Sequence, residues 1–277
     1  MRASRWEKIQ ASSPHAGFLV VAGILVGFWS CAPIGHGTPS LSIDFSSQRH
    51  GTRELVQILA QRIDRFRSLR SLARVTYWKT EEKGSIQGAF LVRRPDRLRM
   101  ETLSLLGAIL VLTVDGNEVV GFYPREGTFY RGRASKKNLA RYIQIPLELR
   151  DLTSLLMGLP PVEIHWPWEG ENLRIQRSLS GGGSEVVTFD PDMGIPIGWE
   201  RVGPDGEVEL SAVFSDFIST PVGPFPLRIS LESYGSQEER LEIRYQEPEV
   251  NVALSASLFV QQKPSHVREF PLESLGG

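Results

Sequence analysis

Few residues in this chain of 277 have the type and spacing that chemistry requires. The histidines, at positions 15, 36, 50, 165 and 266, show no metal-ligand spacing. The sequence has no phosphate-binding, dinucleotide-binding, serine-hydrolase or zinc-protease motif. Asp190 and Asp192 lie in an Asp-Pro-Asp-Met-Gly stretch, which turn formation explains better than acid and base catalysis does. We therefore expect no enzyme activity, no metal and no cofactor.

Cys31 is the single cysteine of the chain, and it lies where an apolar run ends. Three basic residues within the first eight positions precede the run Ala16–Trp29, and the small residue Ser30 follows it. This order resembles a bacterial lipoprotein signal, in which the cysteine becomes the lipid-modified first residue of the mature protein. Phe28 and Trp29 are bulkier than the residues that such a lipobox usually has. We expect a signal peptide over 1–30 and a flexible tether over 31–51.

An uncleaved membrane anchor is the alternative interpretation of this N-terminal run. The run Ala16–Trp29 is shorter than the roughly 20 residues that span a bilayer. A lone cysteine also forms no internal disulfide, so lipidation of Cys31 explains its presence better than a structural role does.

The composition fits a globular domain and gives no sign of a polyanionic partner. Hydrophobic residues make up 41% of the chain and aromatic residues 9%, which is enough for a core. The formal net charge is −1, so we expect no nucleic-acid partner and favour apolar or mixed ones. We expect one domain over 52–262 and a C-terminal tail over 263–277.

The first part of that domain has helical periodicity. Apolar residues recur at steps of three and four from Leu55 to Leu72, with polar and charged residues between them. Thr52 precedes this pattern and is the predicted N-cap. We expect an amphipathic helix with one apolar stripe that needs a partner surface.

From Ala73 onward the period is two for most of the chain. Leu98 and Met100, for example, alternate with arginines, and turn compositions separate successive alternating segments. This predicts a mainly β (α+β) fold with a large curved antiparallel sheet or partial barrel. The stretch Ile109–Leu112 is apolar on both faces, so we expect this strand to be covered on both sides or to border an apolar cavity.

Two short helices are predicted to interrupt the strands. Ser135–Gln144 and Leu147–Met157 carry helical spacing of leucines, Pro146 separates them, and Pro160–Pro161 ends the second. Their apolar faces need burial, so we expect them to cover the sheet.

Several motifs, in order along the chain, resemble a known family. They are Val92–Glu101, Leu105–Gly107, Tyr123–Pro124, Phe129–Gly132, Leu155–Gly158 and the pair Pro226–Ile229 and Leu241–Tyr245. Together they resemble the outer-membrane lipoprotein carriers and receptors of the LolA/LolB type, most closely the uncharacterised lipoprotein relatives of that group. The resemblance covers the chain from Leu55 to Phe259.

The resemblance implies an open, curved antiparallel half-barrel with an N-terminal helix, a short-helix lid over the concave face, and an apolar cavity. It also implies a lipoprotein anchored in the outer membrane through Cys31, with its body facing the periplasm. Such a protein binds acyl chains or lipoproteins, assists their localisation to the outer membrane, and has a periplasmic carrier protein among its partners. The cavity and lid candidates are Leu98, Met100, Leu139, Ile143, Leu152 and Leu155.

One loop of the family bears on mechanism. In the receptor branch, a leucine in a Pro-Leu-Gly turn protrudes and helps to insert cargo into the membrane. The matching stretch here is Ser104–Gly107, so the resemblance assigns this role to Leu106 with Leu105, which replaces the proline. The alternative is that both leucines pack at the end of a strand.

Three further alternatives stay open at this stage. The basic stretch Arg93–Arg99 is either a patch for anionic headgroups or a solvated strand face with a turn at Pro95. His165–Trp168 is either an interfacial aromatic element or a plug at one end of a barrel. The chain as a whole is either a lipid-handling protein or a structural lipoprotein that uses the same fold for contacts with other proteins.

Overall fold

The computed structural model describes residues 51–79, 82–235 and 238–274. The signal peptide, Cys31 and nearly all of the expected tether lie outside these residues. Within the described ranges, no helix is long and apolar enough to cross a membrane.

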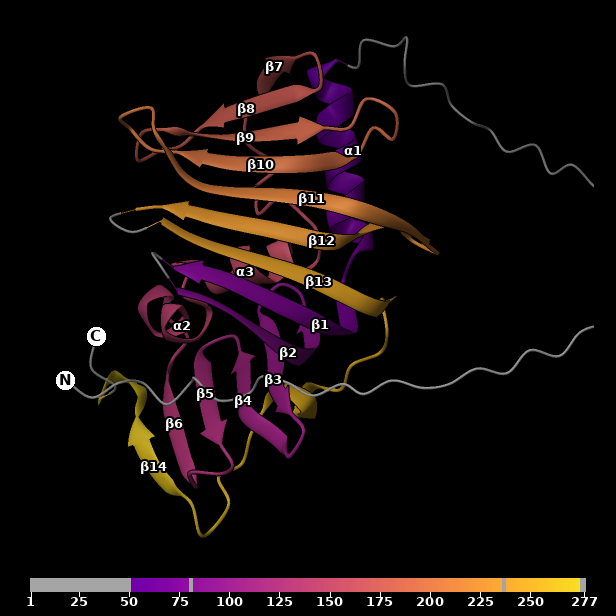
Figure 1. Ribbon diagram of the computed structural model, residues 1–277. Coiled ribbons are helices and arrows are strands. Elements are labelled where there is room, and N and C mark those ends of the chain that lie inside the picture. The colour runs from indigo at the N-terminus through magenta and orange to yellow at the C-terminus, as the bar shows by residue number, and fades with distance from the viewer. Residues whose placement is uncertain (1–50, 80–81, 236–237, 275–277) are drawn as a thin grey trace, which may run out of the picture. The chain divides into compact units, whose positions relative to one another are not determined.

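One sheet of 14 strands dominates the described part of the chain (Figure 1). The strands are β1 (Ser68–Lys79), β2 (Glu82–Arg93), β3 (Arg97–Ser104), β4 (Gly107–Asp115), β5 (Glu118–Tyr123), β6 (Thr128–Arg133), β7 (Glu169–Glu171), β8 (Arg174–Ser178), β9 (Ser184–Phe189), β10 (Pro196–Val202), β11 (Val208–Thr220), β12 (Gly223–Tyr234), β13 (Glu238–Val250) and β14 (Arg268–Pro271). Their order across the sheet is β14-β6-β5-β4-β3-β2-β1-β13-β12-β11-β10-β9-β8-β7.

The sheet is open, because β14 and β7 form two separate edges. Neighbouring strands are antiparallel except for β14 and β6, which run parallel. Two meanders, β1 to β6 and β7 to β13, meet where β1 pairs with β13. The sheet twists strongly between its two ends, and α1, α2 and α3 pack on it (Figure 1). This confirms the predicted mainly β fold with an open antiparallel sheet and an N-terminal helix.

Helix α1 (Thr52–Arg65) is shorter than its periodicity predicts. Leu55 and Leu59 are fully buried, as an apolar stripe requires, but the chain turns extended at Phe66. The predicted helix to Leu72 is therefore wrong at its C-terminal end, because the backbone from Ser68 pairs with strands on both sides and burial alternates from there on.

The predicted N-cap of α1 is also wrong. The N-cap residue is Gly51, which makes no side-chain capping bond. The Thr52 hydroxyl instead donates to the carbonyl of Gly170 at 2.7 Å, so it links the helix to β7.

Strand β4 is covered on both faces over its second half only, because Ile109 and Leu110 of the predicted apolar run Ile109–Leu112 are half-buried. Four successive residues from Val111 to Val114 are buried. Leu112 belongs to the main core, whereas on the other face the short helix η2 (Ala256–Phe259) lies against β3 and β4. Gln261 follows it and donates to the carbonyl of Val111 at 3.1 Å.

The C-terminal residues take part in the same body. Beyond residue 262, β14 pairs with β6, and Leu272 is fully buried in the main core. Residues 268–272 of the expected C-terminal tail therefore pack with the sheet.

Candidate functional site

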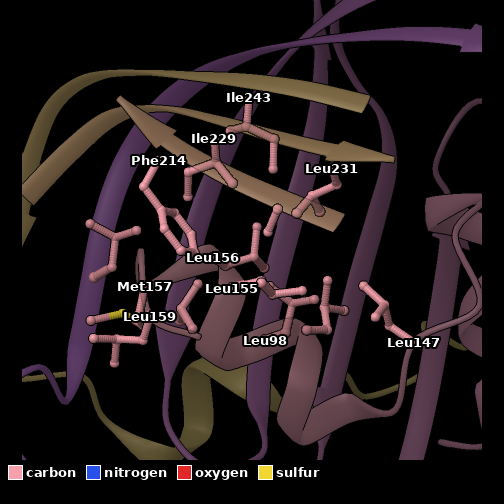
Figure 2. Close-up of a cluster of buried hydrophobic side chains, with 14 of the residues drawn as sticks. Leu98, Leu147, Leu155, Leu156, Met157, Leu159, Phe214, Ile229, Leu231 and Ile243 are labelled. Atoms are coloured by element: carbon pink, nitrogen blue, oxygen red, sulfur yellow. The ribbon is translucent and has the colours of Figure 1, made fainter. Parts of the chain in front are cut away.

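The two short helices lie on the sheet as predicted, with slightly tighter bounds: α2 is Lys136–Ile143 and α3 is Leu149–Leu156. The Ser135 side chain caps α2 by accepting from the amide of Asn138 at 3.3 Å. Figure 2 shows Leu155 and Leu156 of α3 directed towards the apolar side chains of the sheet. Both leucines belong to the main core.

An apolar cavity of about 120 Å³ lies between these helices and the sheet. It is lined by Val75, Tyr77, Ile86, Phe90, Leu98, Met100, Tyr142, Ile143, Gln144, Ile145, Leu147, Leu152, Leu156, Leu231, Leu241 and Ile243. No charged side chain is in this lining, so the cavity suits a hydrocarbon ligand. Its volume is below the roughly 300–1,000 Å³ of ordinary ligand pockets.

One side of the cavity is less covered than the rest. Tyr77, Ile86 and Leu241 are only half-buried, and they lie near the ends of β1, β2 and β13. Tyr142 and Ile143 from the C-terminal end of α2 are half-buried as well. The rim of the cavity therefore lies between this end of the sheet and α2.

Polar side chains attach α3 to the sheet at three points. The Thr153 hydroxyl donates to the carbonyl of Pro95 at 2.5 Å, and the buried Tyr245 hydroxyl donates to the carbonyl of Leu156 at 2.8 Å. Arg201 of β10 bridges Asp151 at 3.0 Å to another carboxylate of the sheet. Burial raises the pKa of Asp151 despite this ion pair. Helix α3 is thus tied to β10, β13 and the turn before β3.

Glu185 of β9 is that other carboxylate, and it is nearly fully buried. It accepts from Arg177 Nη2 at 2.6 Å and from Arg201 Nη2 at 2.9 Å. Two guanidinium groups therefore compensate one buried carboxylate, which is the condition under which a buried charge is tolerated.

Helix α2 is attached differently. Asn138, near its N-terminus, donates at 2.9 Å to the carbonyl of Arg133 and to Glu273. At the other end, the Tyr142 hydroxyl is buried and has no hydrogen-bond partner. Burial raises the pKa of Tyr142, so the hydroxyl is neutral. Its ring tip lies over Gly121 of β5, where an added Cβ would lie 2.2 Å from the hydroxyl oxygen.

The loop between β3 and β4 forms a protruding apolar tip. Leu105 and Leu106 have exposed fractions of 103% and 84%. Ser104 fixes the loop, because its Oγ accepts from the amide of Leu106 at 3.2 Å and donates to the carbonyl of Gly107 at 2.8 Å. Arg125 from the β5–β6 turn also donates to this Oγ, at 2.6 Å. The leucines are therefore held out in solvent by a bonded turn, and they do not pack at a strand end.

The structure brings most of the predicted cavity residues together. Leu98, Met100, Ile143 and Leu152 line the cavity. Leu139 and Leu155 are buried in the core beside it, outside the lining. Half of the lining residues that sequence reasoning missed lie on β1, β2 and β13, such as Val75 and Ile86. Their alternation was visible in the sequence, but the strand pairing that puts them under α2 was not.

Arginines of the basic stretch Arg93–Arg99 make contacts within the chain. Arg93 donates to the carbonyl of Leu254, Arg94 to carbonyls at the end of α1, and Arg99 pairs with Glu101. These arginines are engaged within the chain, which argues against a free patch for headgroups.

The aromatic segment His165–Trp168 is divided between core and solvent. Trp166 is 55% exposed, whereas Trp168 packs against the core. Asp190 accepts at Oδ1 from the amides of Asp192 and Met193, as expected for a turn.

No family model matches the sequence, and no curated protein matches it. Solved structures do match the fold. A putative outer membrane lipoprotein-sorting protein domain from Vibrio parahaemolyticus is 12% identical, with a TM-score of 0.53 over 74% of this chain and 95% of that one. A LolA superfamily protein from Nitrosomonas europaea is also 12% identical, with a TM-score of 0.52 over 74% and 96%.

A DUF1329 family protein from Desulfovibrio piger gives a TM-score of 0.56 at 9% identity, over 75% of this chain and 96% of that one. At these identities the matches establish the fold. The chain has the fold of LolA superfamily and lipoprotein-sorting domains, in agreement with the resemblance that its motifs suggested.

Proposed function

We propose that this protein is a lipoprotein, anchored in the outer membrane through Cys31, that shelters acyl chains beneath α2 and α3 and assists the localisation of lipoproteins. The observation that carries the proposal is the cavity of about 120 Å³, which has no charged lining residue and lies where the fold places its helical cover. The two similar structures described as lipoprotein-sorting and LolA superfamily proteins support it.

The size of the cavity implies that binding requires an opening movement. The cavity is smaller than the roughly 300–1,000 Å³ of ordinary ligand pockets, so we infer that binding a whole acyl chain moves the helical cover. The rim beside α2 is the side where cover is thinnest, and we place the entry there. The exposed Leu105 and Leu106 would then help the chain to pass into a bilayer, because an exposed leucine forgoes about 1.5–3 kcal/mol of burial that the acyl region can restore.

The same volume favours a second candidate, a non-catalytic scaffold lipoprotein of the cell envelope. In that case the side chains that nearly fill the interior serve stability, and the surface serves contacts with proteins. The two candidates differ in whether the interior binds a hydrocarbon ligand.

A substitution that fills the cavity distinguishes the two candidate functions. Val75→Phe adds bulk to a lining position that is nearly buried, whereas Val213→Phe adds the same ring on β11 at a position that is 52% exposed. We expect the purified full chain and Val213→Phe to bind a fluorescent fatty acid and to retain lipid in native mass spectrometry, and Val75→Phe to bind several-fold less. Equal binding by the two variants, or no binding by any form, would favour the scaffold.

The anchor has its own test. Cys31→Ser removes the sole thiol of the chain, so we expect the variant to accumulate as an unprocessed precursor or to leave the membrane fraction. Retention in the membrane with an unchanged mature mass would refute lipidation at this residue.

A further inference from the structure

The less covered side of the cavity ends in one row of residues across the sheet. Tyr77 of β1 pairs with Gly84 of β2 on one side and with Leu241 of β13 on the other. Tyr77 and Leu241 line the cavity and are half-buried, whereas the lining residues Leu98 and Leu152 are buried. Figure 1 shows α2 beside the end of β1 that carries this row. A ligand that enters at the rim therefore meets this row first.

The ring of Tyr77 fills the space that Gly84 leaves open. A Cβ atom added to Gly84 would lie 2.2 Å from the ring carbon Cζ and 2.2 Å from the hydroxyl oxygen of Tyr77. The ring therefore lies against the backbone of β2, on the face of the sheet that carries the cavity. Gly84 itself does not line the cavity, so at this row the wall is the Tyr77 ring.

Packing alone holds this ring in its position. Among the residues that the structure describes, none is hydrogen-bonded to the Tyr77 hydroxyl, whereas the buried Tyr245 hydroxyl donates to the carbonyl of Leu156 at 2.8 Å. The Tyr77 ring therefore sets the width of the entrance by its bulk. No charged side chain lines the cavity, so the part of a ligand that passes the ring is hydrocarbon.

We propose that Tyr77 determines which hydrocarbon chains enter the cavity, and that its ring selects straight acyl chains over branched ones. The cavity of about 120 Å³ leaves little room beside the ring, so a chain has to pass between Tyr77 and α2. A methyl branch widens a chain at one point, and a tight apolar site discriminates by the size of a single such group. This role rests on the proposed lipid-sheltering function and adds the class of acyl chain that the site accepts.

The test compares two fatty acids that differ in width. Palmitic acid is straight, and phytanic acid carries methyl branches on a chain of the same length. Each is used to displace a fluorescent fatty acid from the purified full chain. We expect the wild-type protein to prefer palmitic acid by roughly tenfold. Tyr77→Ala removes the ring and should make the two acids nearly equal, whereas Tyr77→Phe keeps the ring and should keep the preference.

A second substitution tests whether the ring acts from its position on Gly84. The methyl group of Gly84→Ala would overlap the ring and lift it from the sheet towards α2, so we expect weaker binding of both acids and a larger preference for palmitic acid. Combined with Tyr77→Ala, the same substitution has no ring to move and should have little effect. Gly198→Ala is the matched control, because its Cβ would meet neighbours at an ordinary 3.6 Å.

Thermal unfolding of each variant separates an altered entrance from a loss of the fold. Tyr77→Leu, which shortens the side chain and keeps it apolar, should change the preference in the same direction and replaces the alanine variant if that one is unstable. Equal displacement by the two acids from the wild-type protein, an unchanged preference without the ring, or an effect of Gly84→Ala that persists without the ring would each overturn the proposal.

The outcomes also distinguish this proposal from the proposed function. If Val75→Phe weakens fatty-acid binding and Tyr77→Ala leaves the preference unchanged, the lipid-sheltering function stands and the role of Tyr77 fails. If no form of the protein binds a fatty acid, the lipid-sheltering function fails, and the role of Tyr77 fails with it.

Discussion

Helices α2 and α3 cover the same cavity but are held in place by different forces. Helix α3 buries Leu152, Leu155 and Leu156 and is tied to three parts of the sheet by side-chain hydrogen bonds and an ion pair. Helix α2 is bonded through Asn138 near its N-terminal end, and the Tyr142 ring near its C-terminal end packs over Gly121.

Because the two helices are attached differently, we do not expect them to move as one unit. We expect α3 to behave as part of the core and the C-terminal end of α2 to be the part that moves when a ligand enters. Local opening is easiest where few buried contacts hold a segment.

The largest effect is expected for Leu152→Asp. The side chain of Leu152 is only 3% exposed, so the substitution places a carboxylate in an apolar cavity without a partner. We expect a loss of several kcal/mol in the free energy of unfolding, measured by urea denaturation. Leu106→Glu, at an exposed position, should leave stability near wild type. Similar stabilities for the two variants would show that α3 is not part of the core.

Gly121→Ala acts on α2 alone. The added methyl group would overlap the Tyr142 hydroxyl and should displace the ring, at a cost of about 1–3 kcal/mol. We expect faster hydrogen exchange in α2, unchanged exchange in α3, and faster uptake of a fluorescent fatty acid. Gly198→Ala is the matched control, because its Cβ would meet neighbours at an ordinary 3.6 Å. Equal acceleration in both helices would mean that they open together.

Tyr245→Phe removes one attachment of α3 and keeps the ring. The carbonyl of Leu156 then loses its buried donor, so we expect a decrease of about 1 kcal/mol in the free energy of unfolding. Tyr234→Phe, at a tyrosine that is 43% exposed, should have a smaller effect. An unchanged free energy of unfolding for Tyr245→Phe would show that this hydrogen bond does not help to hold α3 in place.

The smallest effect is a pH dependence at Asp151. Because burial raises its pKa, the folded state binds this proton more tightly than the unfolded state does. The stabilisation that the protonated Asp151 contributes to the folded state is fully present below the ordinary aspartate pKa of about 3.9. It is lost as the pH rises through the raised pKa of the folded state. Relative to Asp151→Asn, the wild-type protein should therefore lose stability as the pH rises over that range. A relative gain would mean that the ion pair with Arg201 outweighs the burial.

The sequence predicted most of the sheet, because alternation over many strands is a strong local signal. The end of α1 was missed, since Leu69 and Leu72 continue the helical spacing although they belong to a strand. The cavity was foreseen only for residues on α2, α3 and β3. Its other walls depend on pairings such as Val75 with Ile243, which no local pattern shows. The unequal attachment of α2 and α3 depends on contacts of the same kind, such as that between Tyr245 and Leu156, 89 residues apart.

The pairing of β1 with β13 has a consequence for how the chain folds. The first strand of the sheet meets the next-to-last one at the junction of the two meanders, so this contact closes a long loop. Each meander can form hairpin by hairpin, but the junction requires β13, and such distant pairings slow folding. Until it closes, β1 presents an unpaired edge with the apolar residues of the cavity wall beside it, which is a site for pairing with other chains. Loss of β13 would therefore leave this edge of β1 open to pairing with other chains, and it would also remove Leu241 and Ile243 from the cavity wall.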